Sequence, residues 1–403
     1  MTGSTSLRAT FVAMLAFGFA SRVALCDPPD AADPRVVFAA AIPPGYPKSK
    51  SLDVIQRWLW DENVRVATEA HRKATEGVIR QPGSCGGCIC VGADPSVLPL
   101  AEWQSLVELS TQQLADPSAA ARTEALQFAL YLQQIAMSER CSGVLAPKLR
   151  SAVAALSSDS DADVRKLALQ ALGSFADVDR TDRGVVRIEM KAAIDALADK
   201  DSAARAAAVQ ALSSMTLHAV PESNAMGEFA PLAIERLLPL CEDSDRMTRL
   251  VAIQTLARVG TERVGPLMPK FKEWLGSEDR IKRAGVYMSV RNLGAGAAPL
   301  VPQLMENARQ AGNPERMRAI MSLGRIGKEA ACSVDLLTSI AFEKDQIAAS
   351  TARLSLARLG PHAASAAPKL RQLAASCAEI AKECNWAAEV IEGVRKIDEP
   401  WNP

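Results

Sequence analysis

The chain has 403 residues, which is too long for one compact core unless the core is divided among repeated units. Hydrophobic residues make up 48% of the sequence and aromatic residues only 4%, so the core must consist mainly of Ala, Leu, Val and Ile. The 46 basic and 46 acidic side chains cancel, and this lack of a basic excess argues against a nucleic-acid-binding protein.

Residues 1–26 have the pattern of an export signal peptide. Arg8 supplies the positive start, and Thr10–Ala20 forms an apolar core of the usual length. Cleavage after Ala20 or after Cys26 would follow a roughly small-x-small sequence. The alternative is a lipid anchor at Cys26, although the residue before it is larger than a lipoprotein signal requires. We therefore expect export to the periplasm or beyond the cell, with no transmembrane segment after signal removal.

Two segments separate the signal from the main part of the chain. Residues 27–50 contain six prolines and are predicted to form an extended tether. Residues 51–97 are predicted to form an N-terminal helix, over Leu52–Ile79, and a cysteine-containing loop.

The loop carries three closely spaced cysteines, Cys85, Cys88 and Cys90. In an exported chain they favour a structural disulfide, with Cys141 as a candidate partner. The alternatives are a metal site, for which no fourth ligand is evident, a redox-active motif, and unpaired thiols. We expect no cofactor.

From residue 245 to residue 360 the sequence repeats one frame. Copies begin at Arg249, Arg283, Arg316 and Ala349, so the period is 34, 33 and 33 residues. Each copy places apolar residues at helical spacing and ends at a glycine. This combination of period and pattern predicts a stacked two-helix repeat.

Less regular copies extend the array in both directions. They begin at Arg122, Arg165 and Arg205 upstream, and at Cys384 downstream. We predict an all-α fold, an α-solenoid of about eight two-helix repeats over residues 98–397. Glycines are expected to end its second helices. These are Gly173, Gly260, Gly294, Gly327 and Gly360.

The repeats resemble HEAT repeats, in particular the short bacterial type also found in phycobilin lyases. The resemblance covers about residues 98–397 and implies the solenoid fold. For function it implies a scaffold or adaptor, and only occasionally an enzyme.

An aspartate stands four positions before the first position of most copies, as Asp161 does before Arg165. An Asp at a helix start accepts hydrogen bonds from free N–H groups of the first turn. The Arg is expected to reach back to that Asp or across to the Asp of the neighbouring repeat. We interpret the pairs as a structural ladder that sets the repeat spacing. The alternative is a row of acid–base pairs lining a groove.

A second row of arginines lies near the ends of four second helices, at Arg258, Arg291, Arg325 and Arg358, although Asn292 holds the equivalent position in the second copy and Arg291 stands beside it. Residues on the same face include Gln254, Gly285, Met288, Met321 and Leu354. We predict a strip of Arg and Met on the inner wall that binds an acidic segment or an anionic glycan. The alternative is that each Arg stabilises the helix dipole from the last turn.

The remaining cysteines suggest structural roles. Cys377 and Cys384 lie on either side of the last predicted turn, and we expect a disulfide between them. Cys241 and Cys332 lie in apolar helical contexts and are expected to be buried thiols.

The sequence contains no nucleophile elbow, Gly-rich phosphate loop or zinc-protease helix. We therefore expect an exported protein-binding scaffold without catalytic activity, whose partner is a protein with an acidic binding surface. The alternatives are an enzyme or metal-binding protein that uses the Cys85–Cys90 loop, and a lyase-like HEAT enzyme.

Overall fold

The computed structural model describes residues 42–48, 51–76, 97–136, 147–176, 182–217, 225–259 and 261–398. These residues form helices and turns, and no strand occurs among them. The predicted export signal, the Cys85–Cys90 loop and Cys141 lie outside them. The chain divides into two units, Met1–His218 and Ala219–Pro403.

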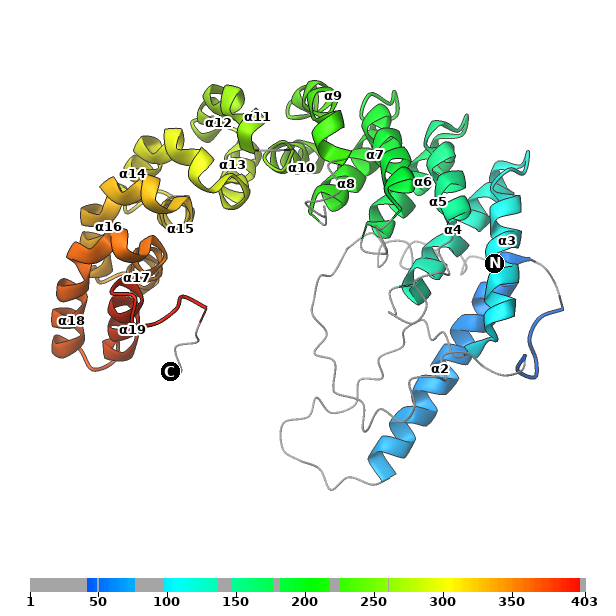
Figure 1. The fold of residues 1–403 in the computed structure, drawn as a ribbon, viewed down its shortest axis with the longest axis horizontal. Helices are drawn as coiled ribbons and strands as arrows, with labels where there is room; N and C mark the ends of the chain where they lie inside the picture. Colours follow the sequence, from blue (N-terminus) through cyan, green and yellow to red (C-terminus); the bar gives the residue numbers. More distant parts are fainter. Residues whose placement is uncertain are drawn as a thin grey trace. The chain divides into compact units, whose positions relative to one another are not determined.

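Unit 1 consists of a long first helix and three helical pairs, shown from blue to green in Figure 1. Its helices are α2 (Leu52–Glu76), α3 (Leu100–Gln113), α4 (Ala119–Ala136), α5 (Pro147–Ala155), α6 (Ala162–Phe175), α7 (Arg183–Ala196) and α8 (Ser202–Leu217). A 3₁₀ turn, η3 (Leu156–Ser158), follows α5. Each first helix (α3, α5, α7) packs against the second helix that follows it. The second helices also pack against one another, so unit 1 has two helical layers.

Helix α2 buries Leu52, Ile55 and Leu59 on one face. Part of the segment expected to be a tether lies against this helix. The Tyr46 ring meets the Trp58 ring edge-on at 5.2 Å between centroids, and the Tyr46 hydroxyl donates to the Glu102 carboxylate at 2.7 Å.

Unit 2 contains five further helical pairs. Its α-helices are α9 (Ala225–Leu240), α10 (Arg246–Leu256), α11 (Thr261–Val264), α12 (Met268–Leu275), α13 (Arg280–Leu293), α14 (Val301–Arg309), α15 (Arg316–Ile326), α16 (Val334–Ala341), α17 (Gln346–Leu359), α18 (Ala367–Ser376) and α19 (Ala381–Ile391). Short 3₁₀ segments join successive pairs: η5 (Gly265–Leu267), η6 (Gly294–Leu300), η7 (Gly327–Ser333) and η8 (Gly360–Ala366).

The second helices of unit 2, α10, α13, α15, α17 and α19, pack side by side in chain order. Figure 1 shows α13 to α19 of this set in one layer, with α12, α14, α16 and α18 in the other. The described residues of the two units together form eight helical pairs. The chain is therefore an all-α solenoid, as the period and pattern predict.

Three of the predicted glycine stops are confirmed. Gly294, Gly327 and Gly360 directly follow α13, α15 and α17 with φ angles of +48°, +82° and +57°. Side chains other than glycine rarely adopt positive φ, so glycine allows the sharp exit into the 3₁₀ segment. Gly260 lies outside the described residues.

Gly173 does not end a helix, contrary to the prediction, because it lies inside α6. A Cβ atom at Gly173 would stand 3.1 Å from the Cα of Ala211 in α8. The glycine therefore serves close packing of two second helices rather than a turn.

Aspartates cap several second helices, as predicted. Asp161 accepts hydrogen bonds from the N–H groups of Asp163 and Val164, and Asp345 accepts from those of Ile347 and Ala348. Each cap satisfies donors that the helix itself cannot satisfy, a contribution of about 1 kcal/mol.

The arginine at the start of most second helices forms a ladder between repeats. Arg165 donates from Nη1 to the carbonyl oxygens of Asp159 and Ser160 at 2.9 and 3.2 Å, and from Nε to Asp199 of the next repeat at 2.7 Å. The hydrogen bond from Arg165 lowers the pKa of the Asp199 carboxyl below its usual value. The arginine thus holds its own turn and the next repeat together.

The same arrangement recurs along the chain. The bridging pairs are Arg122–Asp159, Arg165–Asp199, Arg249–Asp279, Arg283–Glu315, Arg316–Glu343 and Arg353–Glu383. The structural interpretation of the ladder is confirmed. The arginines with described contacts reach carbonyl oxygens of the preceding loop or helix end and the acid of the next repeat, instead of the carboxylate of their own cap.

In α17 the ladder arginine occupies a position that the repeat frame does not predict. Ala349 stands at the first position of that copy, and Arg353, one helical turn later, makes the bridge. Its guanidinium is 1% exposed and donates to Ala341 O at 3.0 Å and to Glu383 at 2.9 Å.

We predict that Gly324→Ala destabilises unit 2. A Cβ at Gly324 would lie 2.7 Å from the Cα of Ser355, so α15 and α17 would have to separate. Overpacking of this kind costs about 1–3 kcal/mol, which urea-induced unfolding would measure. The matched control is Gly296→Ala, where the new methyl group meets nothing within 4 Å. Equal stability of the two variants would contradict the packing argument.

We predict that Arg353→Gln destabilises the protein by about 3–5 kcal/mol, because it leaves Glu383 and a carbonyl oxygen without their buried partner. The control is Arg309→Gln, which removes an exposed pair with Glu306 and should cost less than about 1 kcal/mol. Denaturant unfolding of both variants provides the measurement. A small loss for Arg353→Gln would show that the ladder contributes little.

Candidate functional site

Three of the four predicted site arginines lie on adjacent second helices of unit 2. Arg291, Arg325 and Arg358 occupy the last turns of α13, α15 and α17. Because these helices pack side by side, the three guanidinium groups form a row across them. We call this the arginine row.

The arginine row differs from the ladder in its pairing. Within the described residues, its three arginines form no hydrogen bond or ion pair. The Nη1 of Arg358 is buried without a hydrogen-bond partner. Burial lowers the pKa of the Arg358 guanidinium, and the charges of Arg325 and Arg291 lower it further. Three like charges therefore act on one another, with one buried N–H group left unsatisfied.

Arg258, the fourth predicted residue, has a different environment. It lies two residues beyond the end of α10, and burial lowers the pKa of its guanidinium. The charges that shift the pKa of Arg358 do not include that of Arg258. The structure thus brings together three of the four arginines, and the role of all four in binding stays a prediction.

The helix-dipole interpretation is compatible with these positions. A cation in the last turn of a helix contributes about 0.3–1 kcal/mol, and all three arginines of the row stand there. The dipole does not account for the mutual repulsion or for the unsatisfied Nη1 of Arg358. These two features distinguish the row from ordinary helix-end residues.

Apolar side chains accompany the arginine row. Met288 is 52% exposed, and Met321 and Leu354 are partly exposed. Each precedes its arginine by three or four positions, which places both on one helix face. Gln254 and Gly285, which the sequence also assigns to this face, are buried. The Gln254 amide donates to Met288 Sδ at 3.2 Å.

The expected disulfide between Cys377 and Cys384 is absent, because both side chains are free thiols. Cys384 lies in the first turns of α19 with its side chain in the core, and burial raises the pKa of its thiol. Cys377 is half-buried directly after α18, so the two residues sit in different environments.

The other two described cysteines differ from each other. Cys241 is buried as predicted, and burial raises the pKa of its thiol. Cys332 is exposed, contrary to the prediction. It lies in η7, where the 3₁₀ period of three residues presents side chains differently from the expected α-helix.

No group of three or more His, Cys, Asp and Glu side chains within the described ranges could hold a metal ion. None of the described helices is both long enough and apolar enough to span a membrane.

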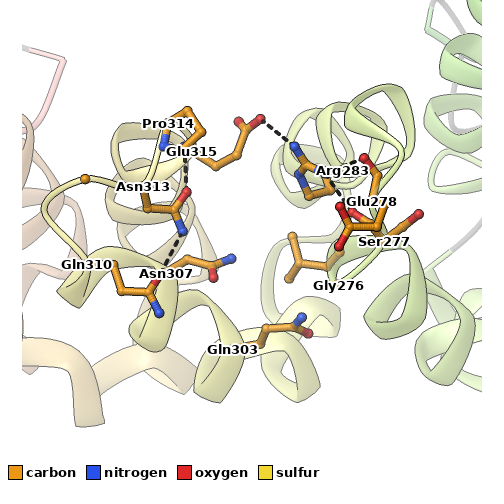
Figure 2. Close-up of a pocket in the computed structure, with 12 residues that line it drawn as sticks. Gly276, Ser277, Glu278, Arg283, Gln303, Asn307, Gln310, Asn313, Pro314 and Glu315 are labelled. Carbon is orange, nitrogen blue, oxygen red and sulfur yellow. Dashed lines mark hydrogen bonds and ion pairs between the residues drawn. The ribbon is translucent and has the colours of Figure 1, made fainter.

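Sequence reasoning missed a polar pocket of about 630 Å³ between two repeats of unit 2. Figure 2 shows Arg283, Ser277 and Glu278 on one side and Asn313 and Glu315 on the other. The pocket lies where the loop from Gln310 to Glu315 joins α14 and α15. The irregular loop sequence, with Gly312 and Pro314, is the one available signal.

The polar groups of this pocket are largely occupied by one another. Arg283 donates to the carbonyl oxygens of Ser277 and Glu278, and the N–H of Glu315 donates to Asn313 at 2.8 Å. Arg283 and Glu315 are 3.9 Å apart, the longest contact of the described ladder. The pocket is therefore a widened step of the ladder.

No protein-family model matches the chain, and no curated protein matches it. Similar solved structures include a designed armadillo repeat protein, with 18% identity over 63% of this chain and 100% of that chain and a TM-score of 0.41. Another designed armadillo repeat protein, in complex with the peptide (KR)4, has 17% identity over 63% and 99%, with a TM-score of 0.40. An engineered protein has 18% identity over 49% and 85%, with a TM-score of 0.40. The solenoid assignment rests on the chain's own helices and packing.

We predict that Arg358→Gln leaves the protein as stable as the wild type or slightly more stable. The change removes one of three like charges and a guanidinium whose Nη1 is unsatisfied. Urea unfolding compares it directly with Arg353→Gln, one helical turn earlier on α17. A loss above about 1 kcal/mol would assign Arg358 to stabilisation of the helix end.

Proposed function

We propose that this protein is an exported HEAT-type scaffold that binds an acidic segment of a partner protein along the arginine row. The observation that carries the proposal is the contrast between two sets of arginines. The ladder arginines are paired with acids, whereas Arg291, Arg325 and Arg358 are unpaired among the described residues. Arg258 would extend the contact toward α10.

The chemistry of the row supports an acidic ligand. A guanidinium presents a planar fork of N–H donors that matches a carboxylate. A partner carboxylate would pair with accessible N–H groups of the row and reduce the repulsion among the three charges. Since the net charge of the chain is zero, this attraction is local to the row.

The other parts of the proposal rest on the sequence. Export rests on residues 1–26, and the HEAT type rests on the repeat frame. The proposal of no catalysis and no cofactor rests on the lack of recognisable catalytic motifs in the sequence. The enzyme alternative depends on Cys85–Cys90, outside the described residues.

A labelled peptide of about ten glutamates tests the proposal, with fluorescence anisotropy measured from about 20 to about 200 mM NaCl. The wild type should bind more weakly as salt rises. The triple variant Arg291→Gln, Arg325→Gln and Arg358→Gln should lose about tenfold in affinity, if each contact contributes about 0.5 kcal/mol. Its fold should remain intact by circular dichroism.

The matched control changes three exposed arginines of the same unit, Arg246, Arg309 and Arg371, to Gln. It removes the same charge and should retain most of the binding. Equal losses in both triple variants would overturn the assignment to the row. Tighter, row-dependent binding of a sulfated oligosaccharide would replace the protein partner with an anionic glycan.

A further inference from the structure

Two parallel rows cross the second helices α13, α15 and α17. One is the arginine row. The other, the apolar row, consists of Met288, Met321 and Leu354, each three or four residues before its arginine. Side chains at this spacing are neighbours on a helix surface, about 5–6 Å apart. Each of the three helices thus presents one apolar side chain next to one arginine.

The apolar row ends at α10, and both rows end at α19. In α10 the position equivalent to Met288 is Gln254, which is buried. In α19 the equivalent positions are occupied by Glu389, which pairs with Arg395, and by Gly393. The combined surface therefore covers three helices.

The spacing of the helices limits what can bind along both rows. Packed helices stand about 8–10 Å apart, so consecutive arginines repeat at about that distance. An α-helix laid across them rises about 10.5 Å in seven residues, which complete nearly two turns and return to the same face. Same-face residues of a strand repeat at about 6.6 or 13 Å and miss this spacing.

The width of the surface favours a helix as well. The two rows are separated by one helical turn, and a helix with its side chains is about 10–12 Å across. It can therefore place acidic side chains on one row and apolar side chains on the other. The flexible thioethers of Met288 and Met321 suit an apolar contact of this kind.

We propose that α13, α15 and α17 dock one amphipathic helix of a partner protein. Its acidic side chains, at every seventh position, meet the arginine row, and an adjacent line of apolar side chains meets the apolar row. This inference rests on the proposed function and adds the conformation and register of the bound segment. Charge complementarity with the arginine row requires that the bound face of the partner helix be negatively charged.

Three peptides of about 21 residues test the register, since that length gives three heptads. The first has Glu at every seventh position and a neighbouring line of Leu, in a helix-forming background. The second has the same composition with Glu and Leu in scrambled order. The third is proline-rich with Glu at every third position, because a polyproline turn also rises about 9.3 Å. The first should bind wild-type protein at least about tenfold more tightly than the others.

A variant tests the apolar row: Met288→Ser, Met321→Ser and Leu354→Ser together. It should weaken the heptad peptide about tenfold while binding of the glutamate peptide stays unchanged. The control, Ile188→Ser with Leu217→Ser, removes side chains that are 48% and 60% exposed on α7 and α8 of unit 1, and should bind the heptad peptide normally. Circular dichroism with urea unfolding checks that both variants fold.

The outcomes separate this inference from the proposed function. Equal binding of heptad and scrambled peptides, equal or tighter binding of the proline-rich peptide, or an unaffected apolar-row variant would overturn the helical docking. In each case, if the glutamate peptide still bound in a way that depended on the three arginines, the proposed function would be retained. Loss of that dependence would overturn the arginine row itself, and the helical docking with it.

Discussion

The arrangement of this solenoid depends on a buried guanidinium at the boundary between repeats. A charge in such a place is tolerated only when its donors are paired, because removing it from water is costly. Arg165 meets this condition with two carbonyl oxygens of its own turn and with the carboxylate of Asp199. One side chain therefore holds the turn in shape and fixes the position of the following repeat.

Close helix packing is the second constraint, and it makes the repeats regular. Gly324 lets α15 approach the backbone of α17 at Ser355, whose hydroxyl donates to Ile320 O at 2.9 Å. Helices that meet through small residues have little freedom to slide or rotate. The exposed faces of α13, α15 and α17 therefore repeat at a regular interval, which a row of side chains needs to act together.

Arginines at different positions of a second helix have opposite pairing. On α17, Arg353 is buried and paired with Glu383, whereas Arg358 lies in the last turn with no acidic partner among the described residues. The first arrangement contributes to stability because both charges are satisfied. The second leaves a positive charge that no described acidic side chain pairs with. Residue type alone does not separate these two roles. The ion-pair partners of each arginine within the chain do.

The sequence by itself determined the features that depend on local physics. A helical pattern with a period of 33 or 34 residues requires two helices per unit, and an exit with positive φ requires glycine at Gly294, Gly327 and Gly360. An aspartate before a helix can cap it wherever the helix stands, as Asp161 does. These properties depend on neighbours within a few residues, and the sequence displays those neighbours directly.

Only the tertiary structure decided which side chains meet across repeats. It placed Gly173 against Ala211, selected Arg353 for the ladder, buried Gln254, and left Cys377 and Cys384 as separate thiols. It also brought Arg291, Arg325 and Arg358 close enough for their charges to act on one another. Each of these contacts joins residues whose separation depends on helix rotation and on loop shape, as in the loop from Gln310 to Glu315. A repeat pattern specifies that helices stack, but the packing of the side chains between them sets which atoms come into contact.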